Sequence, residues 1–353
     1  MFGRWRSRQR VVKLVLVVAL LLVALSSFLT VAFRDSPNSP LSPIPLVPKA
    51  AQEQAVCDSP PACFNYIFTT FGGKNGKDER TLDVYTSADG IHFTPYVMGA
   101  YKPENSLLRD PSIILHDDGW YYVVHTTSWD GNDFALIKSK DLKTWDHVVT
   151  IKIKLTDEDL KVADDKPRVA QSWAPEFFRD PQTNKIHIII SLRHFEMKTN
   201  FAPYIFTATS RDLKFWTPGN PLNVTGLTPA DSYIDMFIIY DGSDKATPYH
   251  GFMKNEVEKH IEHLAAASVE GPWQFVQKGD FAGWGTKEGP AVVEKPGGGW
   301  RMWADDYHGH VKYADSDDLW NWTKMVDMPD GVSSKVRHGT ILRQDRKGTL
   351  LPQ

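Results

Sequence analysis

Three acidic residues and one histidine stand at the openings of short apolar segments along this chain. When five such segments are aligned on their Pro or Gly, equivalent positions are taken by Asp110, Ala174, Asp235, Gly289 and His338, and Glu288 stands one residue earlier. Side chains alternate along a strand, so this offset points Glu288 in a different direction. We therefore expect Asp110, Asp235 and His338 to enter one central funnel, with Glu288 nearer its rim.

These side chains suit acid and base catalysis on a glycosidic bond. An inverting hydrolase needs one ionised carboxylate to activate water and one protonated carboxyl group to protonate the leaving oxygen. A neighbouring negative charge can keep the second group protonated. Three of these residues also have a structural alternative: Asp110 can form an Asp-Pro turn, Asp235 can be a buried, hydrogen-bonded acid, and His338 can be a satisfied core histidine.

A second repeat indicates which elements position these residues. A Ser-x-Asp/Glu turn followed by an aromatic residue occurs five times, at Ser87 to Phe93, Ser139 to Trp145, Ser210 to Trp216, Ser268 to Trp273 and Ser316 to Trp322. Spacings of roughly 50 to 70 residues between the segment openings suit one four-stranded blade per repeat. The sequence therefore predicts an all-β, five-bladed propeller, in which the Ser-x-Asp/Glu turns are structural.

The two ends of the repeat array predict a composite blade. The segment at His338 has too little chain after it for a complete blade, whereas strand-like runs near 65–71 and 81–86 have no inner strand before them. Pairing of first and last strands removes the exposed edges that an open array leaves. We expect residues 62–345 to form one closed domain, followed by a short tail at 346–353.

The order of the segment openings resembles glycoside hydrolase family 43, the family of arabinanases, α-L-arabinofuranosidases and β-xylosidases. The resemblance is carried by Arg109-Asp110-Pro111-Ser112-Ile113, Trp173-Ala174-Pro175-Glu176, Ile234-Asp235, Glu288-Gly289-Pro290 and Arg337-His338-Gly339. It implies a five-bladed propeller that releases arabinofuranose or xylose from plant-type polysaccharide or a related glycan, with inversion.

The resemblance also implies roles for the site residues. Asp110 resembles the general base, Glu288 the general acid, and Asp235 the third carboxylate, which orients the acid and raises its pKa. His338 resembles the axial histidine that holds water or a cation, so no cofactor is required but a structural calcium ion on the axis is allowed. Met236 departs from the Pro or small residue that often follows the third carboxylate.

Further residues are candidates for contact with the sugar. Trp129, Trp173 and Trp284 can stack on its apolar face, although tryptophans are also used in the cores of propellers. Glu176 can bind a sugar hydroxyl or pair with Arg168 or Arg179. The acidic and histidine-containing run at 305–310 is typical of a substrate-facing rim loop more than of a metal site.

Two other functions fit parts of the pattern. A retaining, fructan-type hydrolase or transferase propeller uses an N-terminal Asp as its nucleophile, but the Trp-Ala-Pro and Glu-Gly-Pro strings favour family 43. A non-catalytic carbohydrate-binding propeller needs no set of three acids. The formal net charge of the 353 residues is only −3, which excludes the basic footprint of a nucleic-acid-binding protein. We expect a monomer with an oligo- or polysaccharide substrate.

The N-terminal segments predict entry into the secretory pathway. Five basic residues lie within the cytosolic segment 1–13, ahead of an uncharged apolar run at 14–33 that is long enough to cross a bilayer. We favour an uncleaved type II anchor over a cleaved signal peptide. A Pro/Ser-rich stem at 34–61 follows, so the domain is expected to be lumenal, extracellular or secreted.

Two further features agree with that compartment. Cys57 and Cys63 are close enough in sequence to close a disulfide in an oxidising compartment, the alternative being two free thiols. Asn223 and Asn321 each begin an Asn-x-Thr glycosylation sequon.

Overall fold

The computed structural model describes residues 65–72, 78–156, 169–194, 200–228 and 230–344. The predicted anchor, stem, Cys57 and Cys63 lie outside these ranges, as do Arg168 and the C-terminal tail. Within them, no helix has the length and apolar character that crossing a membrane requires.

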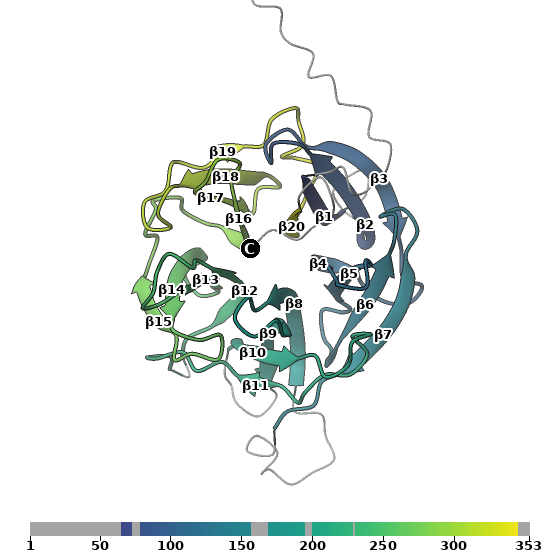
Figure 1. Cartoon of the computed structure of the whole chain (residues 1–353), viewed down its shortest axis with the longest axis horizontal. Coiled ribbons are helices and arrows are strands. Elements are labelled where there is room, and N and C mark those ends of the chain that lie inside the picture. The colour runs from purple at the N-terminus through teal and green to yellow at the C-terminus, as the bar shows by residue number, and fades with distance from the viewer. Residues whose placement is uncertain (1–64, 73–77, 157–168, 195–199, 229, 345–353) are drawn as a thin grey trace, which may run out of the picture. The chain divides into compact units, whose positions relative to one another are not determined.

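The described residues form five four-stranded antiparallel sheets arranged as blades around a central axis (Figure 1). Four blades are meanders of consecutive strands, in the chain order that the sequence predicts. Their strands are β4 (Arg109–Leu115), β5 (Tyr121–Thr126), β6 (Asp133–Ser139) and β7 (Asp146–Lys152); β8 (Val169–Arg179), β9 (Ile186–His194), β10 (Ala202–Thr207) and β11 (Asn220–Pro221); β12 (Tyr233–Tyr240), β13 (Tyr249–Asn255), β14 (His260–Ala266) and β15 (Gln274–Gln277); and β16 (Glu288–Glu294), β17 (Trp300–Asp305), β18 (Val311–Ser316) and β19 (Val326–Asp327).

The fifth blade is composite, which confirms the predicted ring closure. It contains β1 (Tyr66–Gly72), β2 (Asp78–Ser87), β3 (Thr94–Tyr101) and β20 (Thr340–Arg343), in the order β20-β1-β2-β3. The last strand pairs with the first, from Tyr66 opposite Arg343 to Thr69 opposite Thr340. Strands from both ends of the described chain therefore share one hydrogen-bonded ladder, which closes the ring.

The hydrophobic core lies between neighbouring blades, because each sheet is covered on both faces. The strand β9 shows this, since its run of isoleucines is buried throughout. Between the composite blade and the last complete blade, the ring centroids of Phe68 and Phe93 are 5.8 Å apart and those of Phe93 and Trp303 are 6.3 Å apart. Strands that are buried on both faces have nearly continuous apolar sequences, and β9 is an example.

The Ser-x-Asp turns stabilise the blades from outside the axis. At Ser139, the hydroxyl accepts hydrogen bonds from the amides of Asp141 and Leu142, and the Asp141 carboxylate accepts those of Lys143 and Thr144. The Trp145 indole then donates to the Leu142 carbonyl at 3.1 Å. The turns at Ser87 and Ser316 form the same Ser and Asp hydrogen bonds, as expected of structural capping turns.

Candidate active site

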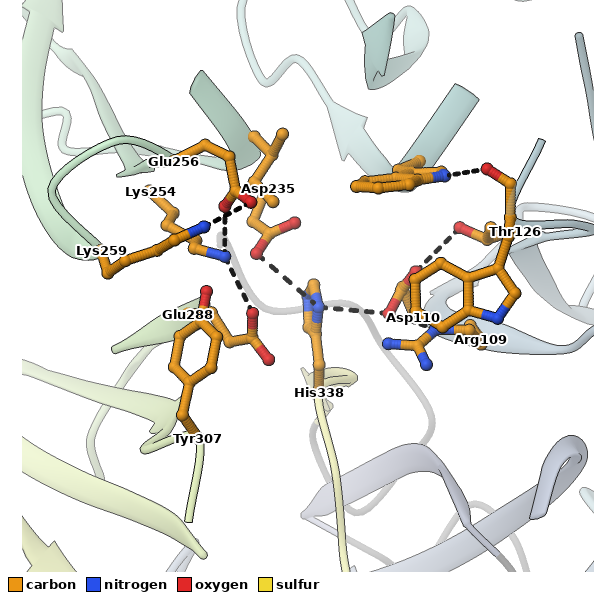
Figure 2. Close-up of a pocket in the computed structure, with 13 residues that line it drawn as sticks. Arg109, Asp110, Thr126, Asp235, Lys254, Glu256, Lys259, Glu288, Tyr307 and His338 are labelled. Atoms are coloured by element: carbon orange, nitrogen blue, oxygen red, sulfur yellow. Dashed lines mark hydrogen bonds and ion pairs between the residues drawn. The ribbon is translucent and has the colours of Figure 1, made fainter. Parts of the chain in front are cut away.

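A cavity of about 270 Å³ lies at the end of the axis where the inner strands begin. Figure 2 shows His338 near its middle, with Asp110 on one side and Asp235 and Glu288 on the other. The residues that the sequence alignment places together are therefore brought together in space. Trp129 and Trp173 also line the cavity.

A bulge in four of the five inner strands, β4, β8, β12 and β16, orients the side chains around the aligned positions. The φ angles at the aligned positions are 50° for Asp110, 49° for Ala174, 58° for Asp235 and 58° for Gly289. Pairing with the next strand shifts register at each of these positions. Positive φ is uncommon outside glycine and clusters at functional sites, and a bulge re-aims the side chains around it.

Hydrogen bonds between blades hold these bulges. The Ala174 amide donates to Thr126 Oγ1 at 2.9 Å, and the Asp235 amide donates to Ser191 Oγ at 3.1 Å. The Gly289 amide donates to Asp235 Oδ2 at 3.0 Å. These three bulges are thus each fixed by the blade that precedes them, so the positions of the site residues depend on neighbouring blades.

Asp110 and His338 form the centre of the charge network. Nδ1 of His338 lies 3.4 Å from Asp110 Oδ1 and 4.0 Å from Asp235 Oδ2. Burial lowers the pKa of the imidazole, but the carboxylates of Asp235, Asp110 and Glu288 outweigh burial and raise that pKa to about 9. The histidine is therefore a cation at neutral pH.

Asp110 is held in its ionised form. Burial raises the pKa of this carboxyl, but the charges of Arg109 and His338 and the hydrogen bond from Thr126 outweigh burial and lower the pKa to about 2. The Thr126 hydroxyl donates to Asp110 Oδ2 at 2.9 Å. An ionised, buried carboxylate beside a cavity is suited to accept a proton from water.

The pKa of Asp235 is shifted in the opposite direction, above its ordinary value. Burial is the largest effect and raises the pKa of this carboxyl to about 6, against the attraction of His338 and Lys254. The carboxylate of Glu288 adds to the increase. Asp235 and Asp110 therefore lie on either side of one imidazolium with pKa values displaced in opposite directions, a pattern typical of sites that use acid and base chemistry.

Sequence reasoning did not find the cation next to Glu288. The Lys254 ammonium lies 3.0 Å from Glu288 Oε2 and 2.5 Å from Glu256 Oε2 (Figure 2). Lys259 in turn lies 2.6 Å from Glu256 Oε1. The available signal was a lysine inside the apolar strand β13, because a lysine is rarely buried unless it is paired.

Aromatic residues form the opposite wall, beside Asp110. The Trp129 and Trp173 rings meet edge to face, with centroids 5.6 Å apart, and the Trp173 indole donates to the Trp129 carbonyl at 2.8 Å. The guanidinium carbon of Arg109 lies 4.1 Å from the Trp129 ring centroid. Trp129 is 45% exposed, so part of this wall is available to a ligand.

Other candidates do not line the cavity. The Trp284 indole donates to the Thr323 carbonyl, and its ring packs against Phe281 and Trp322. Trp284 does not line the cavity, because its ring packs against the hydrophobic core. Trp173 and Trp129 are the predicted tryptophans that reach the site.

Glu176 lies deeper, outside the lining of the cavity. Its carboxylate accepts hydrogen bonds from Ser112 at 2.6 Å and from Thr340 at 2.8 Å. The alternative pairing with Arg179 is wrong, because Arg179 lies 2.8 Å from Asp117. Burial raises the pKa of the Glu176 carboxyl to about 7, although both hydroxyls oppose that increase.

The run at 305–310 is partly strand and partly loop. Asp305 ends β17, is fully buried and lies 3.2 Å from Arg337, whereas Tyr307 lines the cavity. No group of three or more His, Cys, Asp or Glu side chains in the described ranges could hold a metal ion. His338 lies at the axial position where the family resemblance allows a calcium ion.

Comparison with known proteins gives one family match. A family model described as a probable glycosyl hydrolase domain, related to family 43, matches residues 62–347. No curated protein matches the chain by sequence.

Solved structures with similar folds are distant in sequence. An exo-β-1,3-galactanase from Clostridium thermocellum is 13% identical, with 62% of this chain and 48% of that chain covered and a TM-score of 0.47. An endo-arabinase from Bacteroides thetaiotaomicron is 13% identical, with 76% and 91% covered and a TM-score of 0.49. An arabinanase from Bacillus subtilis is 18% identical, with 68% and 81% covered and a TM-score of 0.44. The chain thus spans about half the length of the galactanase.

Proposed function

Because the chain belongs to the family of glycosyl hydrolase domains related to glycoside hydrolase family 43, we propose that it is a glycosidase that hydrolyses its substrate with inversion. The observation that carries this proposal is the placement of two carboxylates, Asp110 and Glu288, on opposite sides of one cavity (Figure 2). Inversion needs a base and an acid that approach one bond from two sides, with room for water between them.

Asp110 is proposed as the general base. Its low pKa keeps it ionised at neutral pH, and Arg109, Thr126 and His338 contact its two oxygens. In the proposed step, Asp110 takes a proton from a water molecule as that water attacks the anomeric carbon. The bond from the anomeric carbon to the leaving oxygen breaks at the same time.

Glu288 is proposed as the general acid. Its carboxyl group gives its proton to the leaving oxygen, so that a neutral alcohol departs and Glu288 becomes ionised. Asp235 is proposed to assist through its negative charge and through the hydrogen bond that it accepts from the Gly289 amide, which fixes the backbone next to the acid. Trp129 and Trp173 are proposed to stack on the apolar face of a sugar ring.

The substrate is proposed to be an arabinofuranosyl or xylosyl unit of a plant-type polysaccharide or a related glycan. The family resemblance of the segment openings supports this sugar class, and the cavity volume of about 270 Å³ is compatible with a small number of sugar rings. Retained configuration in the product would favour a fructan-type mechanism instead.

We also propose a lumenal, extracellular or secreted location. The basic segment ahead of the apolar run 14–33 supports it, as does the exposure of both sequon asparagines, Asn223 and Asn321. Carbonate extraction and glycosidase digestion of the expressed chain test this location. A soluble product without glycans would contradict it.

The test of the reaction begins with aryl arabinofuranosides and aryl xylosides, with arabinan and xylan alongside. NMR of the first product identifies its anomeric configuration, and inversion is expected. Glu288→Gln should lose about 10²-fold or more on natural glycosides but much less on activated aryl glycosides, because a good leaving group needs little protonation. Asp110→Asn should lose activity on both substrate types.

Asp317→Asn is a matched control, because this side chain is 94% exposed and its partner is Lys295. Its activity should equal that of the wild type. Equal losses on both substrate types for Glu288→Gln, or an unimpaired Asp110→Asn enzyme, would refute the assigned roles.

A further inference from the structure

Tyr307 presents an aromatic ring on the side of the cavity that holds the proposed acid. Its side chain lines the cavity and is 37% exposed, close to the 45% exposure of Trp129 in the opposite wall. The ring centroid lies 4.6 Å from the Lys254 ammonium, and that ammonium lies 3.0 Å from Glu288 Oε2 (Figure 2). The cavity therefore has an exposed aromatic ring beside each of its two proposed catalytic carboxylates.

A tight turn between β17 and β18 holds Tyr307 in this place. The Tyr307 amide donates to Asp305 Oδ1 at 2.9 Å. The Asp306 carboxylate accepts hydrogen bonds from the amides of His308 at 2.9 Å and His310 at 3.1 Å. The φ angle of Tyr307 is 63°, which is uncommon for an aromatic residue. Such strained positions persist where the surrounding structure imposes them, and they cluster at sites that hold ligands.

We propose that Tyr307 is a specificity-determining residue that receives the sugar unit released as the leaving group. This inference rests on the proposed inverting function and deepens it by assigning the residue that selects the leaving side of the substrate. In that reaction the base and its water lie opposite the leaving oxygen, and the acid contacts that oxygen. The residues beside Glu288 and away from Asp110 therefore meet the leaving group.

The neighbours of Tyr307 suit a sugar as that leaving group. Glu256 and Lys259 also line this side of the cavity, and the Lys259 side chain is 40% exposed (Figure 2). A sugar ring has an apolar face and a rim of hydroxyl groups, so it can stack on Tyr307 while its hydroxyls bond to Glu256 and Lys259. An alkyl leaving group could use only the aromatic ring. These three residues together therefore favour a bond between two sugar rings.

The experiment measures kcat/KM on xylobiose or arabinobiose and on the methyl glycoside of the same sugar. Both leaving groups are alcohols that need the acid, but only the disaccharide places a second ring beside Glu288. In Tyr307→Ala, the ratio of kcat/KM on the disaccharide to that on the methyl glycoside should fall about 5-fold, which corresponds to about 1 kcal/mol of ring contact. Tyr307→Phe keeps the ring and should restore the wild-type ratio.

The ratio separates loss of the sugar contact from damage to the acid. Tyr307 also covers Lys254, so its removal can disturb Glu288, but such a disturbance lowers kcat/KM on both substrates and leaves their ratio in place. Tyr307→Gly is a second variant without the ring, because glycine adopts positive φ without strain. A folded variant without the ring that keeps the wild-type ratio would overturn the proposal.

Phe215→Ala is a matched control. This ring is 67% exposed, and it lies in the turn from Ser210 to Trp216, away from the residues that line the cavity. The variant removes an exposed aromatic ring of similar size and should keep the wild-type ratio of the two substrates. A fall equal to that of Tyr307→Ala would show a general effect of losing an exposed ring, and it would overturn the proposal.

A second measurement is independent of catalysis. Calorimetric titration of xylobiose, arabinobiose and the two monosaccharides into Glu288→Gln protein measures binding without turnover. Adding Tyr307→Ala should raise the Kd of the bound disaccharide about 5-fold and that of its monosaccharide by less. If the wild type hydrolyses none of these sugars, the proposed function fails, whereas a disaccharide Kd that depends on Tyr307 still supports the assigned contact. A disaccharide Kd that Tyr307→Ala leaves unchanged, or no binding of any of these sugars, would overturn it.

Discussion

The histidine on the axis predicts a pH dependence of folding stability. The pKa of His338 rises from an ordinary value of 6.5 to about 9 in the folded chain. A pKa that is higher in the folded state contributes stability fully below the unfolded value and loses it as pH rises through the folded value. The difference is about 2.5 pH units, and at about 1.36 kcal/mol per unit the contribution is about 3 kcal/mol.

The wild-type protein should therefore lose up to about 3 kcal/mol of unfolding free energy between pH 6.5 and 9 from this residue. The discount for solvent screening is small, because the imidazole is only 11% exposed. Urea unfolding at pH 6, 7, 8 and 9 measures the effect. His338→Gln cannot make the ion pairs, so it should be less stable than the wild type at pH 6, and the two should converge towards pH 9.

Carboxyl groups whose pKa is raised in the folded state also lower the unfolding free energy as pH rises. The informative quantity is therefore the difference in unfolding free energy between the variant and the wild type. His147 is exposed on the outer strand β7. His147→Gln should keep the wild-type pH dependence. A constant difference between wild type and His338→Gln from pH 6 to 9 would refute the reasoning that the imidazole is charged in the folded state.

Three further changes test the ring and the cavity. Gly289→Ala should lose most of its activity and about 1 to 3 kcal/mol of unfolding free energy. The cause is that φ is +58° at this position and a Cβ atom would lie 2.4 Å from the imidazole Cγ of His338. Kinetics measure the activity, and urea unfolding measures the stability. Deleting residues from 337 onward should cost several kcal/mol by removing the β20 ladder and exposing an edge, and a truncated protein with unchanged melting temperature and activity would contradict ring closure. Trp129→Ala should raise KM about 5-fold with little change in kcat if the ring stacks on the sugar, and an unchanged KM would exclude that contact.

The fold could be predicted because the sequence repeats its signals at equivalent places. The positions aligned with Asp110 share a positive φ in four blades, and the turns at Ser87, Ser139 and Ser316 share one pattern of hydrogen bonds. The composite blade also followed from counting strands at the two ends. These features depend on short-range sequence patterns that recur from blade to blade. One sequence therefore shows each pattern several times.

The partner of Glu288 could not be predicted in the same way. Lys254 lies in a second strand and reaches the acid across a blade boundary, so no repeat marks it. The contact depends on the directions of two side chains and on the cover that Tyr307 provides from a loop. Trp284 shows the same limit, because stacking on a sugar and packing between strands require the same residue type.

The alignment of the inner strands could also have predicted the position of Glu176. The residues two positions after Asp110, Ala174 and His338 are equivalent to one another in the alignment, so they should meet one layer deeper on the axis. These residues are Ser112, Glu176 and Thr340, and both hydroxyls do bond to the Glu176 carboxylate. The inner strands therefore stack two polar layers, of which the upper, around His338, faces the cavity. The lower layer links β4 and β8 to the closing strand β20. Glu176, which the sequence suggests as a sugar ligand, therefore has a position suited to stabilising the closed ring.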